Sequence, residues 1–264
     1  MKKIILRKPI NYQSLVERAH LIASYPRSGN TWTRFLIKDI LSNANEELVS
    51  AGQKSKFGTA IPDIHATKNL DEIIQSEDFS GIIKTHYIDS DMNNKIIYIF
   101  RKAIDVLPSY LRFHKYSGFE NYDKPYSFKL TNCFLNELIS HWKTAIKIYY
   151  KSPNQIFFLS YEMLHNIPNE CLKSCCNFLK FDNVSDFNIS KSIKMNEFNS
   201  MKNHSFFSEN RNNEVFMASG KVGAGTMEFN TMLKMWVEIK SLYYYKKLHK
   251  NALINCKINI NPVI

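Results

Sequence analysis

Apolar residues fall in short runs along the chain, and stretches with helical spacing separate these runs. The runs predict buried strands at residues 21–23, 82–83, 96–100 and 156–159. Helices are predicted at about 31–42, 102–115, 131–150, 161–179 and 230–250. Apolar strands in alternation with helices are typical of a parallel sheet covered on both faces. The pattern therefore predicts an α/β fold with a central parallel sheet flanked by helices.

The remaining segments predict loops around this sheet. Residues 43–80 are polar and indicate loops with a short helix, and residues 116–130 are aromatic and turn-rich, as in a binding loop. Residues 199–229 are rich in Asn, Ser and Gly and indicate a long functional loop. No repeat or linker interrupts the sequence, so residues 1–264 are expected to form a single domain.

Composition narrows the classes of partner. The net charge is +11, but the lysines are scattered and no run of five basic residues occurs, which indicates a solvated basic surface. Such a surface can steer a polyanionic small cofactor. The net charge is the only feature of the sequence that favours a nucleic-acid partner. The N-terminal apolar stretch is too short for a signal peptide, and no apolar run could span a bilayer. We expect a cytoplasmic protein without a membrane or nucleic-acid partner.

The cysteines do not form a metal-binding pattern. Five are present without CxxC spacing, and Cys171, Cys175 and Cys176 occur at helical spacing among apolar residues. They are expected to be packed, reduced thiols, and no metal site is predicted.

The segment 21–32, LIASYPRSGNTW, combines a short strand, a tight turn and the start of a helix. Backbone N–H groups of the turn and the dipole of the helix converge on one point, which favours an anion. Arg27 adds a positive charge, Ser28 and Thr31 add hydroxyl donors, and Gly29 permits close backbone approach. The segment predicts a P-loop-like site for a phosphate or sulfate group. Its spacing and order do not match the nucleotide-binding pattern GxxxxGK[ST].

Two further segments carry polar side chains at predicted strand ends. In residues 82–89, IIKTHYID, Lys84 and His86 would share one side of an extended chain. Histidine is suited to proton transfer because its ordinary pKa lies near neutrality. Arg101 follows the predicted strand 96–100, at the edge where open α/β sheets bind ligands.

These motifs resemble those of cytosolic-type sulfotransferases, which use 3'-phosphoadenosine 5'-phosphosulfate (PAPS). The phosphate loop of that family reads YPKSGTTW, and here Arg27 replaces Lys and Asn30 replaces Thr. The family segment KTH matches Lys84 to His86. In the family motif R-N-P-x-D-x-x-x-S-Y, the matching residues are Arg101, Asp105, Ser109 and Tyr110. The resemblance covers roughly residues 20–225, with gaps.

The resemblance implies in-line transfer of a sulfuryl group from PAPS to a hydroxyl or amine of an acceptor. Adenosine 3',5'-bisphosphate (PAP) would be the product. His86 would act as the general base, while Arg27 and Lys84 would neutralise charge on the transferred group and the departing nucleotide. Thr31 and backbone N–H groups would hold the 5'-phosphate. Because a sulfuryl group carries less charge than a phosphoryl group, cationic side chains can suffice without a metal.

Weaker matches downstream concern the nucleotide. Residues 157–164, FFLSYEML, resemble a family segment whose Tyr, here Tyr161, lies near the adenine. Asn196 and Phe198 lie in a segment that resembles T-S-F-x-x-M-K, and Phe198 would stack on the base opposite Trp32. Such stacking is worth about 1–3 kcal/mol per base. The cofactor-binding residues that the resemblance implies are Arg27, Ser28, Gly29, Asn30, Thr31, Trp32, Arg101, Ser109, Tyr161, Asn196, Phe198, Gly220 and Lys221.

The last family motif, R-K-G-x-x-G-D-W-K, departs most from this sequence. Gly220 and Gly223 keep their spacing, but the two basic residues before them are absent. In the family these basic residues hold the 3'-phosphate together with the residues at positions 101 and 109. Lys221 or Arg211 could substitute for them.

Other functions stay open on the sequence alone. A nucleotide-dependent kinase would need a carboxylate-bound Mg²⁺, and no Asp lies at a strand end near the loop. A nucleotide-binding module that has lost activity is favoured by the missing Arg-Lys pair, whereas the retention of Lys84 and His86 argues against it.

The acceptor is the least constrained part of the prediction. The spacing between His86 and Arg101 is short for the family, which indicates trimmed acceptor loops and a pocket lined by residues 43–65 and 116–126. We expect a small soluble acceptor, such as a hydroxylated or amine-bearing natural product. A polysaccharide would require a clustered basic groove. The aromatic residues that could form walls of the pocket, or simply pack a surface loop, are Tyr116, Phe119, Tyr122 and Tyr126. The oligomeric state stays open.

Overall fold

The computed structural model describes residues 19–44, 61–65, 67, 70–76, 79–116, 126–181, 184–197 and 221–258. Within them, parallel strands form one sheet in the order β2-β1-β3-β4. The strands are β1 (His20–Ser24), β2 (Ile82–Thr85), β3 (Ile96–Phe100) and β4 (Ile156–Ser160). Every predicted strand lies within one of these, so the α/β fold with a central parallel sheet is confirmed.

The strands are buried on both faces. All side chains of β2, β3 and β4 are buried, as are those of β1 after its first residue. This explains why the strands appear in the sequence as continuous apolar runs rather than as an alternating pattern.

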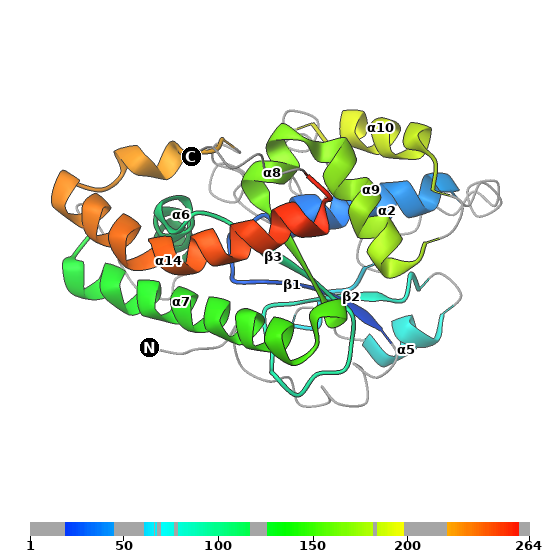
Figure 1. Ribbon diagram of the computed structural model, residues 1–264, viewed down its shortest axis with the longest axis horizontal. Coiled ribbons are helices and arrows are strands. Elements are labelled where there is room, and N and C mark those ends of the chain that lie inside the picture. The colour runs from blue at the N-terminus through cyan, green and yellow to red at the C-terminus, as the bar shows by residue number, and fades with distance from the viewer. Residues whose placement is uncertain are drawn as a thin grey trace.

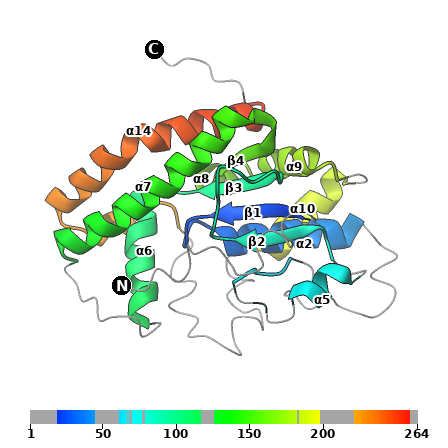
Figure 2. The same cartoon turned by 90° about the horizontal axis from the view of Figure 1, so that it is seen from below.

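Helices cover the sheet on both sides. They are α2 (Asn30–Ala44), α5 (Leu70–Gln75), α6 (Ala103–Tyr116), α7 (Phe128–Lys151), α8 (Tyr161–Asn166), α9 (Pro168–Leu179), α10 (Asp186–Met195) and α14 (Thr231–Asn255). Figure 1 shows α2, α9 and α10 above the strands, α7 below them and α14 crossing in front. Helices α7 and α14 pack against each other and run side by side in Figure 2. In the described part of the chain, no helix is long and apolar enough to cross a membrane.

Several predicted helix boundaries were wrong. The helix predicted at 161–179 is two helices, because Pro168 lacks the N–H that would continue α8 and instead begins α9. Helix α7 begins earlier than predicted, at a Ser127 cap whose hydroxyl accepts the Leu130 N–H. Helix α10 was not predicted. The cysteines at positions 171, 175 and 176 are buried free thiols, as expected.

Pro108 lies inside α6 without ending the helix. Because proline has no N–H, the carbonyl of Ile104 receives no intrahelical bond from position 108. Gly225 packs against this carbonyl so closely that a Cβ there would lie 2.0 Å from the Ile104 oxygen. The position of the missing N–H thus coincides with the place where the segment around Gly225 meets α6.

Candidate active site

The strand order brings the two anion-binding motifs together. From β1 the chain goes to β2 on one side of β1, and then to β3 on the other side. Such a reversal opens a crevice at the carboxyl ends of the strands. The loop 25–29 follows β1, and Arg101 follows β3, so both lie at this crevice.

The phosphate loop has the backbone geometry of an anion cradle. Arg27 and Gly29 both adopt positive φ angles, of 69° and 101°. A side chain at Gly29 would collide with Tyr161, because a Cβ would lie 2.4 Å from the ring. Ser28 is fully buried, and its hydroxyl has no hydrogen-bond partner among the described residues. A buried hydroxyl donor at the N-terminus of α2 fits an anion.

Arg27 connects the loop to α6. Its Nε donates a 3.0 Å hydrogen bond to Ser109 Oγ, and its guanidinium lies 5.5 Å from the ring centre of Phe113. Arg27, assigned to the transferred group, is thus in direct contact with Ser109, assigned to the 3'-phosphate. Sequence positions 82 residues apart therefore line one site.

Asn30 and Thr31 begin α2. The side-chain NH₂ of Asn30 donates to Ser24 Oγ at 3.1 Å and to the Ile22 carbonyl at 3.4 Å. Its amide is therefore directed toward β1, and the expected contact with the cofactor would have to come from its backbone. Thr31 is partly buried at the helix start.

Lys84 forms a buried ion pair that the sequence analysis missed. Its Nζ lies 2.7 Å from Asp63 Oδ2, and the side chains are 9% and 21% exposed. Burial favours the neutral acid, but the charge of Lys84 and its hydrogen bond lower the pKa of Asp63 to about 2. The Asp63 carboxyl is therefore ionised near pH 7.

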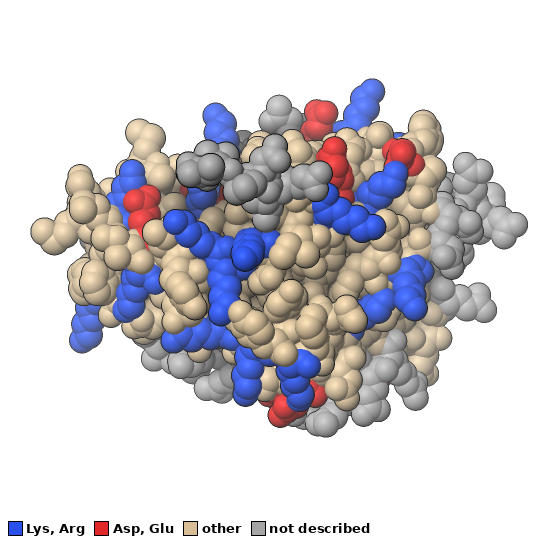
Figure 3. All heavy atoms as spheres, viewed as in Figure 1, with Lys and Arg blue, Asp and Glu red and all other residues tan. Residues whose placement is uncertain are grey.

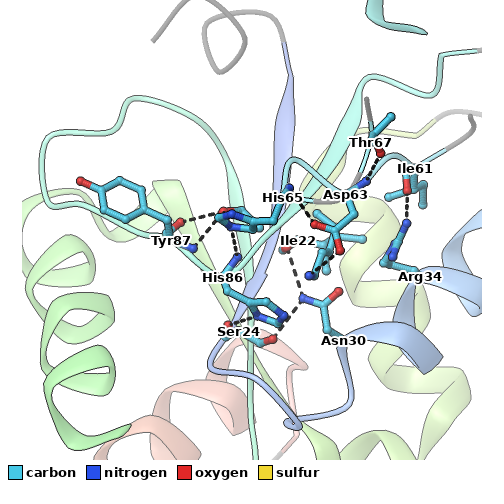
Figure 4. A network of polar contacts seen from close by, with 12 residues as sticks. Ile22, Ser24, Asn30, Arg34, Ile61, Asp63, His65, Thr67, His86 and Tyr87 are labelled. Carbon is cyan, nitrogen blue, oxygen red and sulfur yellow. Dashed lines mark hydrogen bonds and ion pairs between the residues drawn. The ribbon is translucent and has the colours of Figure 1, made fainter. Parts of the chain in front are cut away.

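Backbone pairing places Asp63 beside Lys84. The Lys84 N–H donates to the Pro62 carbonyl at 2.9 Å, and the Lys84 carbonyl accepts the Ile64 N–H at 3.0 Å. Residues 62–64 thus extend the sheet at the outer edge of β2. Arg34 of α2 donates to the Ile61 carbonyl and anchors the same segment (Figure 4).

His86 is held in one tautomer. Its Nδ1 lies 2.7 Å from the carbonyl oxygen of Ser24, which can only accept, so Nδ1 carries the proton. Burial, with the nearby charge of Lys84, lowers the pKa of His86 well below its ordinary 6.5. The ring is therefore neutral at pH 7, with the lone pair on Nε2. This is the state that a general base requires.

A second histidine lies directly beside the first. The Nε2 of His65 accepts the backbone N–H of His86 at 3.3 Å, and the two rings stack with centroids 6.2 Å apart (Figure 4). Burial and the charge of Lys84 lower the pKa of His65 to about 4. Neither Asp63 nor His65 was predicted from the sequence. Their i, i+2 spacing, which places both on one face of an extended chain, is the signal that could have revealed them.

The carbonyl of His86 is fixed from the other side. His141 Nε2 donates to it at 2.9 Å, and the Tyr98 hydroxyl donates to His141 Nδ1 at 2.6 Å. Burial lowers the pKa of His141 to about 4, so it stays neutral. The peptide of His86 is thus held at both its N–H and its C=O.

Arg101 lies where the second anion contact was expected. Its guanidinium stacks 4.3 Å from the ring centre of Tyr161, the residue that also contacts Gly29. Its Nη2 donates to the Lys221 carbonyl at 2.9 Å. Lys221 itself is exposed at the start of the last described segment.

Asp105 connects α6 to the glycine-containing segment. Its two carboxylate oxygens accept the N–H groups of Gly223 and Gly225 at 2.9 and 2.8 Å. An ion pair between Arg112 and Glu228 joins the same two parts of the chain. Asp105, which matches the family motif, thus has a structural role: it holds residues 223–225 beside Arg101.

Trp32, which was predicted to stack on the adenine, contacts Asn196 and Tyr161. Its indole N–H donates to the Asn196 carbonyl at 3.0 Å, and its ring lies 5.7 Å from that of Tyr161. The side chain of Asn196 donates to Asp39 at 2.7 Å. Phe198 and Gly220 lie outside the described residues, as do Arg211 and most of the expected acceptor loops, so these assignments stay predictions.

Among the described residues, no group of three or more His, Cys, Asp or Glu side chains could hold a metal ion.

Known proteins share both the sequence pattern and the fold. Relatives include sulfotransferase 1B1 of dog, 25% identical over 198 residues, and sulfotransferase 1E1 of rat, 28% identical over 202 residues. Each match covers 70% of this chain and 66% of the relative, so the chain spans slightly less than two thirds of the length of these relatives.

Solved structures agree on the fold. Retinol dehydratase in complex with androsterone and inactive cofactor PAP matches with a TM-score of 0.61 at 17% identity, over 94% of this chain and 83% of that one. A mouse sulfotransferase in complex with PAP matches with a TM-score of 0.59 at 19% identity, over 92% and 90% of the chains. The predicted sulfotransferase fold is confirmed.

The family assignment rests on a match over most of the chain. The sulfotransferase domain matches residues 17–250, which include the phosphate loop, Lys84, His86 and Arg101. The chain therefore belongs to the sulfotransferase family.

Proposed function

We propose that this protein transfers a sulfuryl group from PAPS to a hydroxyl or amine of a small-molecule acceptor. The observation that best supports this proposal is the neutral His86, whose Nε2 is available as a base at the same sheet edge as the phosphate loop. PAPS supplies the activated sulfuryl group. The residues of this chain bind the nucleotide, take the proton of the acceptor and neutralise developing charge.

Different residues fit the two ends of the nucleotide, and the hydrogen bond from Arg27 to Ser109 joins the two sets. The buried Ser28 hydroxyl, the loop N–H groups and Arg27 fit the 5'-phosphosulfate end. Arg101 and Ser109, with Asp105 holding the glycine-containing segment beside them, fit the 3'-phosphate. The stack of Arg101 on Tyr161 supports this role, because it holds the guanidinium in one orientation.

Asp63 acts as a positioning residue for Lys84. The ion pair and the backbone pairing of residues 62–64 fix the ammonium group on the outer strand. From there Lys84 can neutralise the bridging oxygen of the departing nucleotide. His65 contributes by accepting the N–H of His86.

The printed names of the relatives support a small acceptor. Plant relatives are named for flavonols, such as flavonol 3-sulfotransferase of Flaveria bidentis, 25% identical over 178 residues, which cover 60% of this chain and 55% of that protein. The retinol dehydratase structures hold retinol or androsterone with PAP. These acceptors and ligands are small molecules, in agreement with the expectation from the sequence.

The test of the function is transfer of labelled sulfate from PAPS to a panel of hydroxylated and amine-bearing small molecules, with oligosaccharides alongside. We expect transfer to at least one small molecule and no loss of activity in EDTA. Transfer to oligosaccharides alone would contradict the small-acceptor proposal. Transfer to nothing would favour a nucleotide-binding module, and a metal requirement would favour a kinase.

PAP is expected to bind more tightly than AMP, because Arg101, which follows β3, adds a cationic contact for the 3'-phosphate beyond the 5'-phosphate cradle after β1. Replacing Arg101 with alanine should cost about 1.5–3 kcal/mol of PAP affinity, the range for a hydrogen bond to a charged group. Calorimetry with both nucleotides measures this. AMP is the internal control, since Arg101→Ala should leave its affinity nearly unchanged. Equal affinities of the parent for PAP and AMP would contradict the two-phosphate assignment.

A further inference from the structure

Helix α14 has two apolar faces instead of one. The face toward the core carries Leu233, Val237, Ser241, Leu248 and Ala252. The opposite face carries large apolar side chains that are 38% to 80% exposed, namely Met232, Met235, Trp236, Ile239, Leu242 and Tyr243. Their spacing of three and four residues places them along one stripe. A surface helix of a globular protein normally has one apolar stripe, so the outer one requires a separate explanation.

Helix α7 extends this outer stripe into a broader face. Phe128 and Tyr150 of α7 are 52% and 63% exposed. The ring of Phe128 lies 5.3 Å from that of Trp236. Lys240 of α14 donates to Asn132 of α7 at 2.8 Å. The outer sides of the two helices therefore form one surface, here called the α7/α14 face.

The two helices that form this face are rich in lysine, and of these lysines Lys151 is paired with Asp91. Helix α7 contains four lysines and one glutamate, and α14 contains five lysines and one glutamate. Nine lysines against two glutamates leave a surplus of seven positive charges, in a chain of net charge +11. Figure 3 shows lysines and arginines spread among uncharged residues on this side of the molecule, with few acidic side chains. The face therefore complements an anionic partner.

Lysines and aromatic rings are interleaved on the face. Lys240 lies 5.1 Å from the ring centre of Trp236, and Lys247 lies 4.6 Å from that of Tyr150 and 5.7 Å from that of Tyr243. These side chains are amphipathic: the stems and rings are apolar, and the ammonium, hydroxyl and indole groups are polar. The same combination characterises helices that lie in a membrane interface.

We propose that the α7/α14 face binds the surface of a bilayer that contains anionic phospholipids, which departs from the expectation of no membrane partner drawn from the sequence. The apolar stripe of α14 would enter the interface, and the lysines would contact the headgroups. Nucleic acid would complement the lysines but not the exposed Met and Ile side chains. A second copy of the chain would bring basic surfaces together in a two-fold contact, which is unfavourable.

Sedimentation of the full-length protein with vesicles tests this proposal. We expect binding to vesicles of phosphatidylcholine with phosphatidylserine, and much weaker binding to vesicles of phosphatidylcholine alone. Added salt should weaken the binding to the anionic vesicles, because it screens the lysines from the headgroups. Equal binding to both vesicle types, or binding to neither, would overturn the proposal.

Two variants test the basic and the apolar components of the face separately. Lys246→Glu with Lys250→Glu should lower vesicle affinity roughly 30-fold or more, since each lysine near an anionic surface contributes about a factor of five. Ile239→Asp should also weaken binding, because it places a charge in the apolar stripe. The matched control is Lys191→Glu with Lys194→Glu, the same charge change at exposed positions of α10.

An equal loss in the control pair would show that only net charge matters and would overturn the proposal. So would parent-like vesicle binding by the Ile239→Asp variant. Light scattering identifies the alternative occupant: a dimer of the parent that Ile239→Asp dissociates, without vesicle binding, would assign the face to a second copy. Thermal unfolding of each variant checks its fold. The proposal is independent of the sulfuryl-transfer assignment, because vesicle binding requires no PAPS.

Discussion

His86→Ala is expected to lower sulfuryl transfer by about 10²–10⁴-fold, the range that a general base contributes, while PAP affinity stays close to that of the parent. The expectation follows from the neutral ring, whose Nδ1 proton is committed to the Ser24 carbonyl and whose Nε2 is left as the acceptor. Steady-state rates and calorimetry with PAP measure the two effects separately. Activity within a few-fold of the parent would mean that another group takes the proton.

Two comparisons separate the chemical role of His86 from its structural role. His86→Asn retains a side-chain N–H that can donate to Ser24 but has no basic nitrogen, so it should be as inactive as the alanine variant. His65→Ala should reduce the rate much less, because His65 accepts the backbone N–H of His86 and stacks on its ring but is not assigned as the base. Because the pKa of His86 is lowered, the acid limb of the kcat/KM profile should lie below pH 6.5.

Lys84→Met should lower kcat by about 10²–10³-fold, as the loss of one preorganised charge-stabilising group typically does. It should also destabilise the fold, because it leaves the Asp63 carboxylate without its partner. We expect roughly 2–3 kcal/mol, near the lower end of the cost of breaking a buried pair, because the Asp63 side chain is 21% exposed. Denaturant unfolding and initial rates are the two measurements.

The double variant Asp63→Asn with Lys84→Met separates the two effects. With the unpaired charge removed, much of the stability should return, whereas activity should stay low because the ammonium is still absent. Recovery of activity would contradict the catalytic role of Lys84. Asp63→Asn alone should lower kcat more than PAP affinity if Asp63 positions Lys84.

The pH dependence of stability gives an independent check on the same pair. The pKa of Asp63 is about 2 in the folded protein and 3.8 without the fold, so the folded state binds the proton less readily. The stabilisation from this group is therefore present above about pH 4 and is lost as the pH falls toward 2. Asp63→Asn should remove this part of the pH dependence. An unchanged pH dependence in the variant would contradict the lowered pKa.

The sequence alone determined the sheet and the principal motifs, because these depend on local pattern. Apolar runs identified all the strands in the described residues, since strands buried on both faces need no tertiary information to be recognised. The phosphate loop was equally local, because a strand, a turn with Gly29 and a helix start lie within one short segment. Lys84, His86 and Arg101 followed from their positions beside predicted strands.

Only the tertiary structure decided how the site is held together, because those contacts join residues far apart in the chain. The pairing of Asp63 with Lys84 depends on residues 62–64 adding to the edge of β2, and no periodicity in a polar segment predicts that register. The tautomer of His86 depends on a carbonyl 62 residues away. The outer apolar stripe of α14 was also invisible in the sequence, where its residues read as ordinary helix positions. Which side of a helix meets the core is set by packing, so periodicity alone could not show that this helix has a second apolar face in solvent.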